Sequence, residues 1–276
     1  MNNKYTFHNL PSLEIMEIAS NVTLLDTLCI ECPNLATILV DEANENFVSV
    51  DGVVYTKDTN ELVMYPNTSD ETTITFSGNI ERNAYAAFYT NTSIKTVIIK
   101  NDYAGHFNAL GFLGLEEIIV ESENENYKSV DGVLYSKDGT ILIKYPAKKE
   151  GTSFEVPNSV VSISNSAFSY NAYLEEITLP STLFNIEMLA FSFAESLEEL
   201  IITETVEYLG SNIIVRSSIT SLIIERSVVE HGSITSLNGG IYRTDDLVIY
   251  VPSDSLEDYR VAMVWKNIAD LIEEIE

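Results

Sequence analysis

Apolar residues recur along this chain with a period of about 21–23 residues. Seven segments align on this period, at 12–34, 72–93, 94–114, 152–173, 174–196, 197–218 and 219–240. Each opens with apolar residues at a spacing of three and then two, as in Leu174, Ile177 and Leu179. The last two residues of each set alternate with an outward one, so each opening predicts a short strand that buries one side.

A second apolar group follows each predicted strand, such as Leu183 with Ile186, and several segments then carry an Ala-Phe step. These residues predict a turn-like arm that closes one rung. A single rung cannot bury its own apolar edge, so neighbouring rungs must stack into a solenoid with a continuous core. Such stacking predicts a column formed by Leu174, Leu197 and Ile219.

Two near copies of one longer segment interrupt the period: SVDGVVYTKDTNELVMYP at 49–66 and SVDGVLYSKDGTILIKYP at 129–146. Both alternate polar and apolar residues around Lys-Asp, and Asp131-Gly132 adds a second turn signal. We therefore expect β-hairpin excursions at about 41–71 and 121–151, each inserted into a rung and recurring once per block of a two-level repeat.

The order of these motifs is L-x-x-I-x-L-P, then V-x-x-I, then A-F-x-x-N/C-x-x-L, interrupted by the duplicated segment. This order resembles the leucine-rich repeats of the bacterial surface protein A (BspA-like) type, over nearly the whole chain. The resemblance implies a curved repeat solenoid, typical of secreted or surface-attached proteins that bind other proteins or host surfaces, and it implies no enzyme. The early segments 12–34 and 94–114 depart from it, because they lack the Ala-Phe step.

The C-terminal residues 247–272 also resemble the closing segment of that family. Ser253, Asp254 and Ser255 offer helix N-caps before a run in which Leu256, Tyr259 and Met263 follow a helical spacing. Trp265, Ile268 and Leu271 continue the apolar cover. A partner-binding helix is the alternative to a cap over the last rung. The predicted fold is an α/β leucine-rich repeat solenoid at 1–246, with short parallel strands on one face and inserted hairpins, and a helical capping segment at 247–276.

The charge of the chain excludes some partners. With 42 acidic and 15 basic residues the net charge is −27, so phosphate backbones and anionic membranes are repelled. The first 25 residues show no signal-peptide pattern, and we expect no membrane insertion because no window is apolar enough for a spanning helix. No phosphate loop or hydrolase motif appears, so we expect no cofactor.

Two small constellations have both a chemical and a structural interpretation. Cys29-x-x-Cys32 lacks a second ligand pair for zinc, and we interpret both cysteines as free, buried core residues that occupy slots held by Phe and Asn in other rungs. Glu176 and Glu199 are expected side by side on adjacent strands, where they could act as an acid/nucleophile pair, hold a cation or form a solvated acidic ladder. Because no His, Arg or aromatic clamp flanks them, we favour the solvated ladder.

The strongest candidate for binding is a stripe on the outward face of the predicted strands. Its aliphatic members are Leu39, Ile98, Ile119, Ile201 and Ile223, and its acidic members are Glu117, Glu176 and Glu199. An aliphatic stripe with a polar rim is typical of a protein-binding surface, although β-branched residues also favour strands wherever they face. The two hairpins are the second candidate.

Three functions compete. The first is a non-enzymatic recognition protein for adhesion or receptor binding, located at the cell surface or secreted as the resemblance implies. The second is a structural subunit of a larger assembly, such as a phage virion or surface appendage, suggested by the lack of an export signal; the location would then be a virion or the cytoplasm. The third, a carbohydrate-active enzyme, rests only on Glu176 and Glu199.

Overall fold

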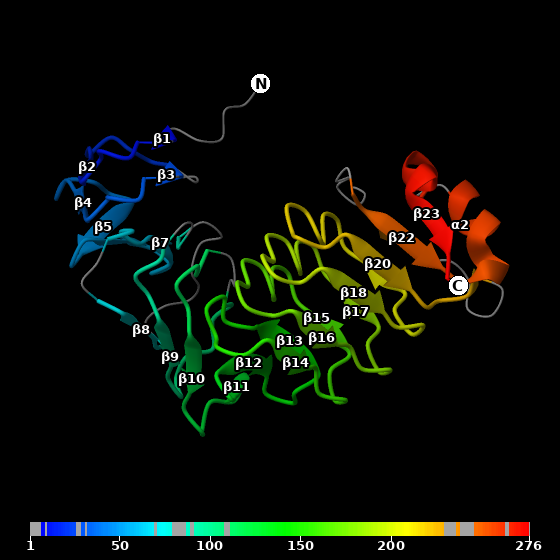
Figure 1. The fold of residues 1–276 in the computed structure, drawn as a ribbon. Coiled ribbons are helices and arrows are strands. Elements are labelled where there is room, and N and C mark those ends of the chain that lie inside the picture. Colours follow the sequence, from blue (N-terminus) through cyan, green and yellow to red (C-terminus); the bar gives the residue numbers. More distant parts are fainter. Residues whose placement is uncertain are drawn as a thin grey trace. The chain divides into compact units, whose positions relative to one another are not determined.

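The computed structural model describes residues 7–8, 10–25, 29–30, 32–68, 71–78, 87–88, 91–107, 111–228, 236–237, 246–262 and 265–275. The chain packs as two compact units, residues 1–132 and residues 133–276 (Figure 1). This packing boundary does not test the predicted division into a solenoid and a capping segment, which stays a prediction.

The first unit is built from short strands. They are β1 (Phe7–His8), β2 (Ile15–Ile18), β3 (Cys29–Ile30), β4 (Thr37–Val40), β5 (Phe47–Val50), β6 (Val53–Thr56), β7 (Leu62–Met64), β8 (Thr73–Phe76), β9 (Thr96–Ile99), β10 (Glu117–Val120) and β11 (Tyr127–Val130). Parallel ladders join β1 to β3, β2 to β4, and β8 to β9 to β10, while β5, β6 and β7 form an antiparallel meander.

The second unit continues with β12 (Val133–Ser136), β13 (Ile141–Lys144), β14 (Ser153–Glu155), β15 (Ser162–Ile163), β16 (Glu176–Thr178), β17 (Asn185–Ile186), β18 (Glu199–Ile202), β19 (Tyr208–Leu209), β20 (Ser221–Ile224), β21 (Ser236–Leu237) and β22 (Val248–Val251). It ends with η1 (Ser253–Ser255), α2 (Leu256–Val261), η2 (Lys266–Leu271) and β23 (Ile272–Glu274). Strand is thus the main regular secondary structure among the described residues, and the helices whose bounds are described, η1, α2 and η2, lie at the C-terminal end. The repeat is therefore a β-solenoid rather than the predicted α/β one.

The rungs of the second unit contribute opening strands and arm strands to parallel ladders. The opening strands form β14–β16 and β18–β20–β22, which β23 extends after the cap, and the arm strands form β15–β17–β19–β21, which begins beside the hairpin strand β13. The openings bury alternate residues, as predicted: Leu200 and Ile202 are fully buried. The predicted turn-like arms prove to be two-residue strands whose inward residues, such as Ile186 and Leu209, are also fully buried.

The core between the ladders is continuous along the second unit. Leu174, Leu197 and Ile219 are all buried in one apolar cluster, as the predicted column requires. The Ala-Phe steps place Phe168 and Phe191 face to face, with ring centroids 5.1 Å apart and planes within 8°. Stacked aromatic rings therefore form one edge of this core.

The first unit has an equivalent aromatic stack. Phe88 and Phe112 stack at 4.1 Å, so Phe112 fills the slot that was predicted to be missing from segment 94–114. The residue before Phe112 is Gly111 rather than alanine, so the Ala-Phe pattern did not identify Phe112 as the equivalent residue.

Antiparallel strand pairs form within both predicted excursions, β5–β6–β7 in the first and β12–β13 in the second. Asp51 and Gly52 take φ values of 51° and 80°, which match the mirror-image turn that a two-residue hairpin loop requires. Asp131 and Gly132 take nearly the same values, 47° and 77°.

The C-terminal cap is confirmed in part. Tyr259 and Trp265 are fully buried in the core cluster of the second unit, and the Tyr259 hydroxyl donates to the Arg226 carbonyl at 2.9 Å. The predicted N-capping is wrong, because the Ser255 hydroxyl instead accepts from the backbone N–H of Val228 at 2.8 Å. The serine joins the cap to the chain that precedes it. Met263 lies outside the described residues.

The prediction of free cysteines is wrong for Cys32, which is fully buried but disulfide-bonded. The only other cysteine of the sequence, Cys29, has a side chain outside the described part. The buried position of Cys32 was predictable from the repeat. The oxidation state of its thiol was not, because that depends on the redox conditions of the compartment and not on packing.

Within the described segments, no helix has the length and apolar character needed to span a membrane.

Candidate functional site

The outward face of the second unit carries a row of apolar side chains across three neighbouring strands, with an acidic residue on the fourth. The parallel ladder sets Ile201 of β18 beside Ile223 of β20, Ile223 beside Tyr250 of β22, and Tyr250 beside Glu273 of β23. Ile201 is 38% exposed, and Ile223 and Tyr250 are half-buried. The inward neighbours of this row, such as Leu222 and Ile249, are fully buried, so the strands that carry the row are anchored in the core.

The row leads into an open hollow of about 880 Å³ beside the cap. Its lining residues are Glu199, Ser221, Ile223 and Tyr250 from the sheet, Leu256 and Arg260 from α2, and Glu273, Glu274 and Ile275 from the last strand and the residue after it. Two residues of the predicted stripe, Glu199 and Ile223, therefore lie in the hollow together with cap residues that the strand pattern did not include.

The hollow is predominantly acidic. Its one cation among the lining residues, Arg260, donates to the Glu257 carboxylate at 3.1 Å and to the Ile272 carbonyl at 2.8 Å, so it joins α2 to β23. Glu199 accepts from the Ser221 hydroxyl at 3.1 Å. The lining thus combines apolar side chains with the carboxylates of Glu199, Glu273 and Glu274.

In the first unit, the predicted residues lie on two separate ladders. Ile98 of β9 sits beside Ile119 of β10, which is 43% exposed, and Glu117 accepts from the Thr96 hydroxyl at 3.3 Å. Leu39 lies on β4, beside Glu17 of β2, and is 45% exposed. The alternation therefore predicted the direction of these side chains correctly.

The strand ladders do not pair the two candidate catalytic carboxylates with each other. Glu176 lies opposite Ser153 in the β14–β16 ladder, and Glu199 lies opposite Ser221 in the β18–β20 ladder. β16 and β18 contact each other but belong to separate hydrogen-bonded sheets. The side-by-side carboxylate geometry thus stays a prediction. No group of three or more metal-ligating side chains forms among the residues described.

The sequence reasoning missed a second apolar surface, on the arm ladder of the second unit. Its members are Ile141, Val161, Phe184 and Tyr208, which are 37–43% exposed. The rings of Phe184 and Tyr208 meet edge to face at 5.1 Å. A signal was present, because Val161 and Phe184 lie at outward positions directly after the inward residues Val160 and Leu183, where polar residues are expected.

Stacked rungs with two parallel ladders and a cap define a repeat solenoid. Residues 147–235 match the model of the BspA type leucine rich repeat region in six copies. Residues 147–235 are thus leucine-rich repeats of the BspA type, and the resemblance predicted from the motifs is confirmed over this segment.

Three solved structures are similar. A leucine-rich repeat protein from Eubacterium ventriosum has a TM-score of 0.58 at 22% identity, and the alignment covers 87% of this chain and 66% of that one. The pneumococcal vaccine antigen PcpA has a TM-score of 0.48 at 18% identity, covering 96% and 68%. A leucine rich cell surface protein from Faecalibacterium prausnitzii has a TM-score of 0.38 at 18% identity, covering 84% and 80%. A search of curated proteins gave no match.

Proposed function

We propose that this chain is a non-enzymatic recognition protein and that the outward strand face of its second unit binds a partner protein. The observation that carries the proposal is the row of Ile201, Ile223 and Tyr250, which ends in an acidic hollow of about 880 Å³. An apolar strip bordered by charged residues has the composition of a protein interface, with an apolar centre and a polar rim.

The energetics of this face favour binding. Removing apolar surface from water contributes about 25 cal/mol per Å² before the entropy cost of association is subtracted, and aromatic residues such as Tyr250 are enriched among the residues that dominate interfaces. The face is built on regular ladders over a fully buried core, so little conformational entropy is lost when it docks.

Adhesion or receptor binding at a cell surface is the finer form of the proposal. The BspA-type repeat supports it, because proteins with this repeat are typically secreted or surface-attached. The disulfide at Cys32 supports it as well, because disulfides persist in oxidising surroundings such as the extracellular space.

The experiment compares two double variants that each add two positive charges to the second unit. Ile201→Lys with Ile223→Lys changes the proposed face, and Ile141→Lys with Val161→Lys changes exposed apolar residues of the arm ladder. Proteins captured from the native source by the unmodified chain are identified by mass spectrometry, and their affinities for all three forms are then measured. Circular dichroism checks that both variants fold.

We expect the first double variant to bind the captured partner at least about tenfold more weakly, since buried charge without a partner is costly, and the arm variant to bind normally. Full binding by the first variant would contradict the proposed site. Capture of several proteins at fixed stoichiometry would instead support the structural-subunit function, and turnover of a glycan that is lost in Glu199→Gln would support the enzyme.

A further inference from the structure

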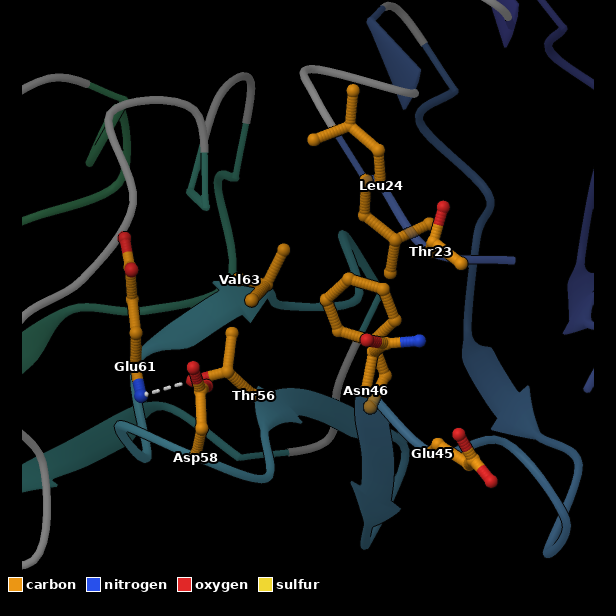
Figure 2. A pocket seen from close by; sticks show the side chains of 10 residues that line it. Thr23, Leu24, Glu45, Asn46, Thr56, Asp58, Glu61 and Val63 are labelled. Atoms are coloured by element: carbon orange, nitrogen blue, oxygen red, sulfur yellow. Dashed lines mark hydrogen bonds between the residues drawn. The ribbon is translucent and has the colours of Figure 1, made fainter. Parts of the chain in front are cut away.

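The first unit contains a pocket of about 360 Å³ that the stripe does not include. Its apolar lining consists of Leu24, Leu25, Phe47 and Val63. Figure 2 shows Leu24 and Val63 among the side chains that line it. Leu24 is 75% exposed, the highest exposure among the large apolar side chains described. A pocket of this size is within the range that binds small ligands or single side chains, and the exposed leucine gives an occupant apolar surface to cover.

The border of the same pocket is acidic. Glu45, Asp58 and Glu61 line it, together with the polar residues Thr23, Asn46 and Thr56. No basic residue is among the lining residues, all of which are described, and the nearby Lys57 donates its ammonium group to the Asn44 carbonyl at 2.6 Å. The pocket therefore combines an apolar lining with a border of negatively charged side chains.

The spacing of these carboxylates argues against a metal ion as the occupant. Among described residues they form no group able to hold one. Carboxylates that flank an apolar surface instead suit a Lys or Arg side chain, whose aliphatic stem lies on apolar groups while its charged head stays at the polar edge.

We propose that this pocket binds a Lys or Arg side chain within a basic, partly apolar segment of a partner protein. Charge complementarity supports this occupant, because three carboxylates border the pocket and the whole chain carries a net charge of −27. The same charge disfavours a second copy of this chain as the occupant. The proposal does not depend on the strand face of the second unit.

The test measures binding of a fluorescent acetyl-Leu-Lys-Leu-Arg-amide peptide to the full chain by polarisation, with acetyl-Leu-Glu-Leu-Glu-amide as the matched control. One variant carries Glu45→Gln, Asp58→Asn and Glu61→Gln. Its control carries Glu175→Gln, Glu195→Gln and Glu198→Gln, which remove the same charge from exposed positions of the second unit. A third variant, Leu24→Ser, removes an exposed leucine from the apolar lining of the pocket.

We expect the basic peptide to bind and the acidic one not to bind. The pocket triple variant should lose about tenfold in affinity, and Leu24→Ser about threefold, while the control triple variant changes little. Raising the salt from about 50 to about 300 mM should weaken binding severalfold, because exposed charges are screened.

Three results would overturn the proposal: no binding of the basic peptide, equal binding of both peptides, or equal losses in the two triple variants, which would indicate diffuse attraction by net charge. The variant Ile201→Lys with Ile223→Lys separates this proposal from the previous one. It should bind the peptide normally even if the strand face has no partner.

Discussion

The two hairpin excursions follow one plan, but at one buried position an apolar side chain in the first copy is replaced by an ionisable one in the second. Met64 ends β7 in the first copy, where it is 9% exposed in an apolar cluster. Lys144 ends β13 at the same place in the second copy, directly before Tyr-Pro, and is 1% exposed. One slot thus holds a thioether in one copy and an amine in the other.

The second copy accommodates the amine by supplying oxygen acceptors. The Lys144 ammonium group lies 3.1 Å from the Ser166 carbonyl, 3.3 Å from the Ser169 carbonyl and 3.4 Å from the Ser169 hydroxyl. Burial lowers the pKa of this lysine to about 7. The comparison indicates that the slot requires a long, unbranched side chain, and that a polar end is tolerated where nearby oxygen atoms accept hydrogen bonds from it.

The largest loss of stability is expected at a buried asparagine that both copies share. Asn124 is fully buried, donates to the carbonyls of Lys100 and Tyr103, and accepts from the backbone N–H groups of Asn126 and Tyr127. Because buried partners left unsatisfied each cost about 1–3 kcal/mol, Asn124→Ala should lower the free energy of unfolding by about 3–4 kcal/mol in urea titrations.

Asn44 makes the matching four hydrogen bonds in the first copy, to the carbonyls of Ala19 and Val22 and from the N–H groups of Asn46 and Phe47. Asn44→Ala should therefore cost about as much, by the same loss of buried hydrogen bonds. The exposed Asn126→Ala is the control and should change little. If the losses in free energy of unfolding caused by Asn44→Ala and Asn124→Ala differ by more than about 2 kcal/mol, the two asparagines do not contribute equally to stability despite their matching hydrogen bonds.

The next effect tests the buried amine. The pKa of Lys144 is about 7 in the folded chain and near 10.5 in the unfolded one, so the unfolded state binds more protons between these values. This group therefore makes the chain more stable as pH rises from about 7 to about 10, with a slope of up to about 1.4 kcal/mol per pH unit. Lys144→Met, which copies the first excursion, should remove that rise and stabilise the chain at pH 6.

Thermal and urea unfolding between pH 6 and 10 measure the slope. Lys266→Met, at an exposed position, is the control and should leave the slope unchanged. Identical pH profiles for Lys144→Met and the unmodified chain would contradict the assignment of a depressed pKa to this lysine.

Much of the fold was predictable because each rung repeats the same burial problem. The spacing of Leu197, Leu200 and Ile202 predicted the strand and its inward face, and the Asp-Gly pairs predicted the hairpins. The arm strands were not predictable as strands, since a two-residue strand is defined by hydrogen bonds to its neighbours. Ser255 was predicted as a helix cap from its local sequence. That sequence cannot show that its hydroxyl accepts a hydrogen bond from the N–H of Val228, 27 residues earlier.

The candidate site was predictable only where it is local. Alternation along one strand identified Ile201 and Ile119 as outward residues. The hollow could not be derived in this way, because Arg260 and Glu273 reach it from the cap, far along the chain from Glu199. The pocket at Leu24 likewise joins a loop to a hairpin some 20–40 residues later.

A smaller difference between the copies concerns the hairpin glycines. Both have positive φ, which costs a residue with a Cβ about 1 kcal/mol or more. At Gly52 an added Cβ would meet the nearest atom at 3.8 Å, whereas at Gly132 it would lie 3.2 Å from the Glu117 Cβ. Gly52→Ala should therefore cost about 1 kcal/mol and Gly132→Ala about 2 kcal/mol, measured by urea unfolding.

A double-mutant cycle isolates the crowding. In a Glu117→Gly background the obstructing Cβ is absent, so the cost of Gly132→Ala should fall to that of Gly52→Ala. An unchanged cost would show that the backbone conformation alone, and not the neighbouring strand, selects glycine in the second copy.

The smallest expected difference lies in the first strand of each excursion, where one serine has opposite roles. The Ser49 hydroxyl donates to the Ile38 carbonyl, whereas the Ser129 hydroxyl accepts from the Val120 N–H at 3.0 Å. A carbonyl with two lone pairs tolerates the loss of a partner better than an N–H does. Ser129→Ala should thus cost about 1 kcal/mol and Ser49→Ala about 0.5 kcal/mol, and amide exchange at Val120 should accelerate only in the former. Equal costs, with no change in exchange at Val120, would show that water replaces either hydroxyl equally well.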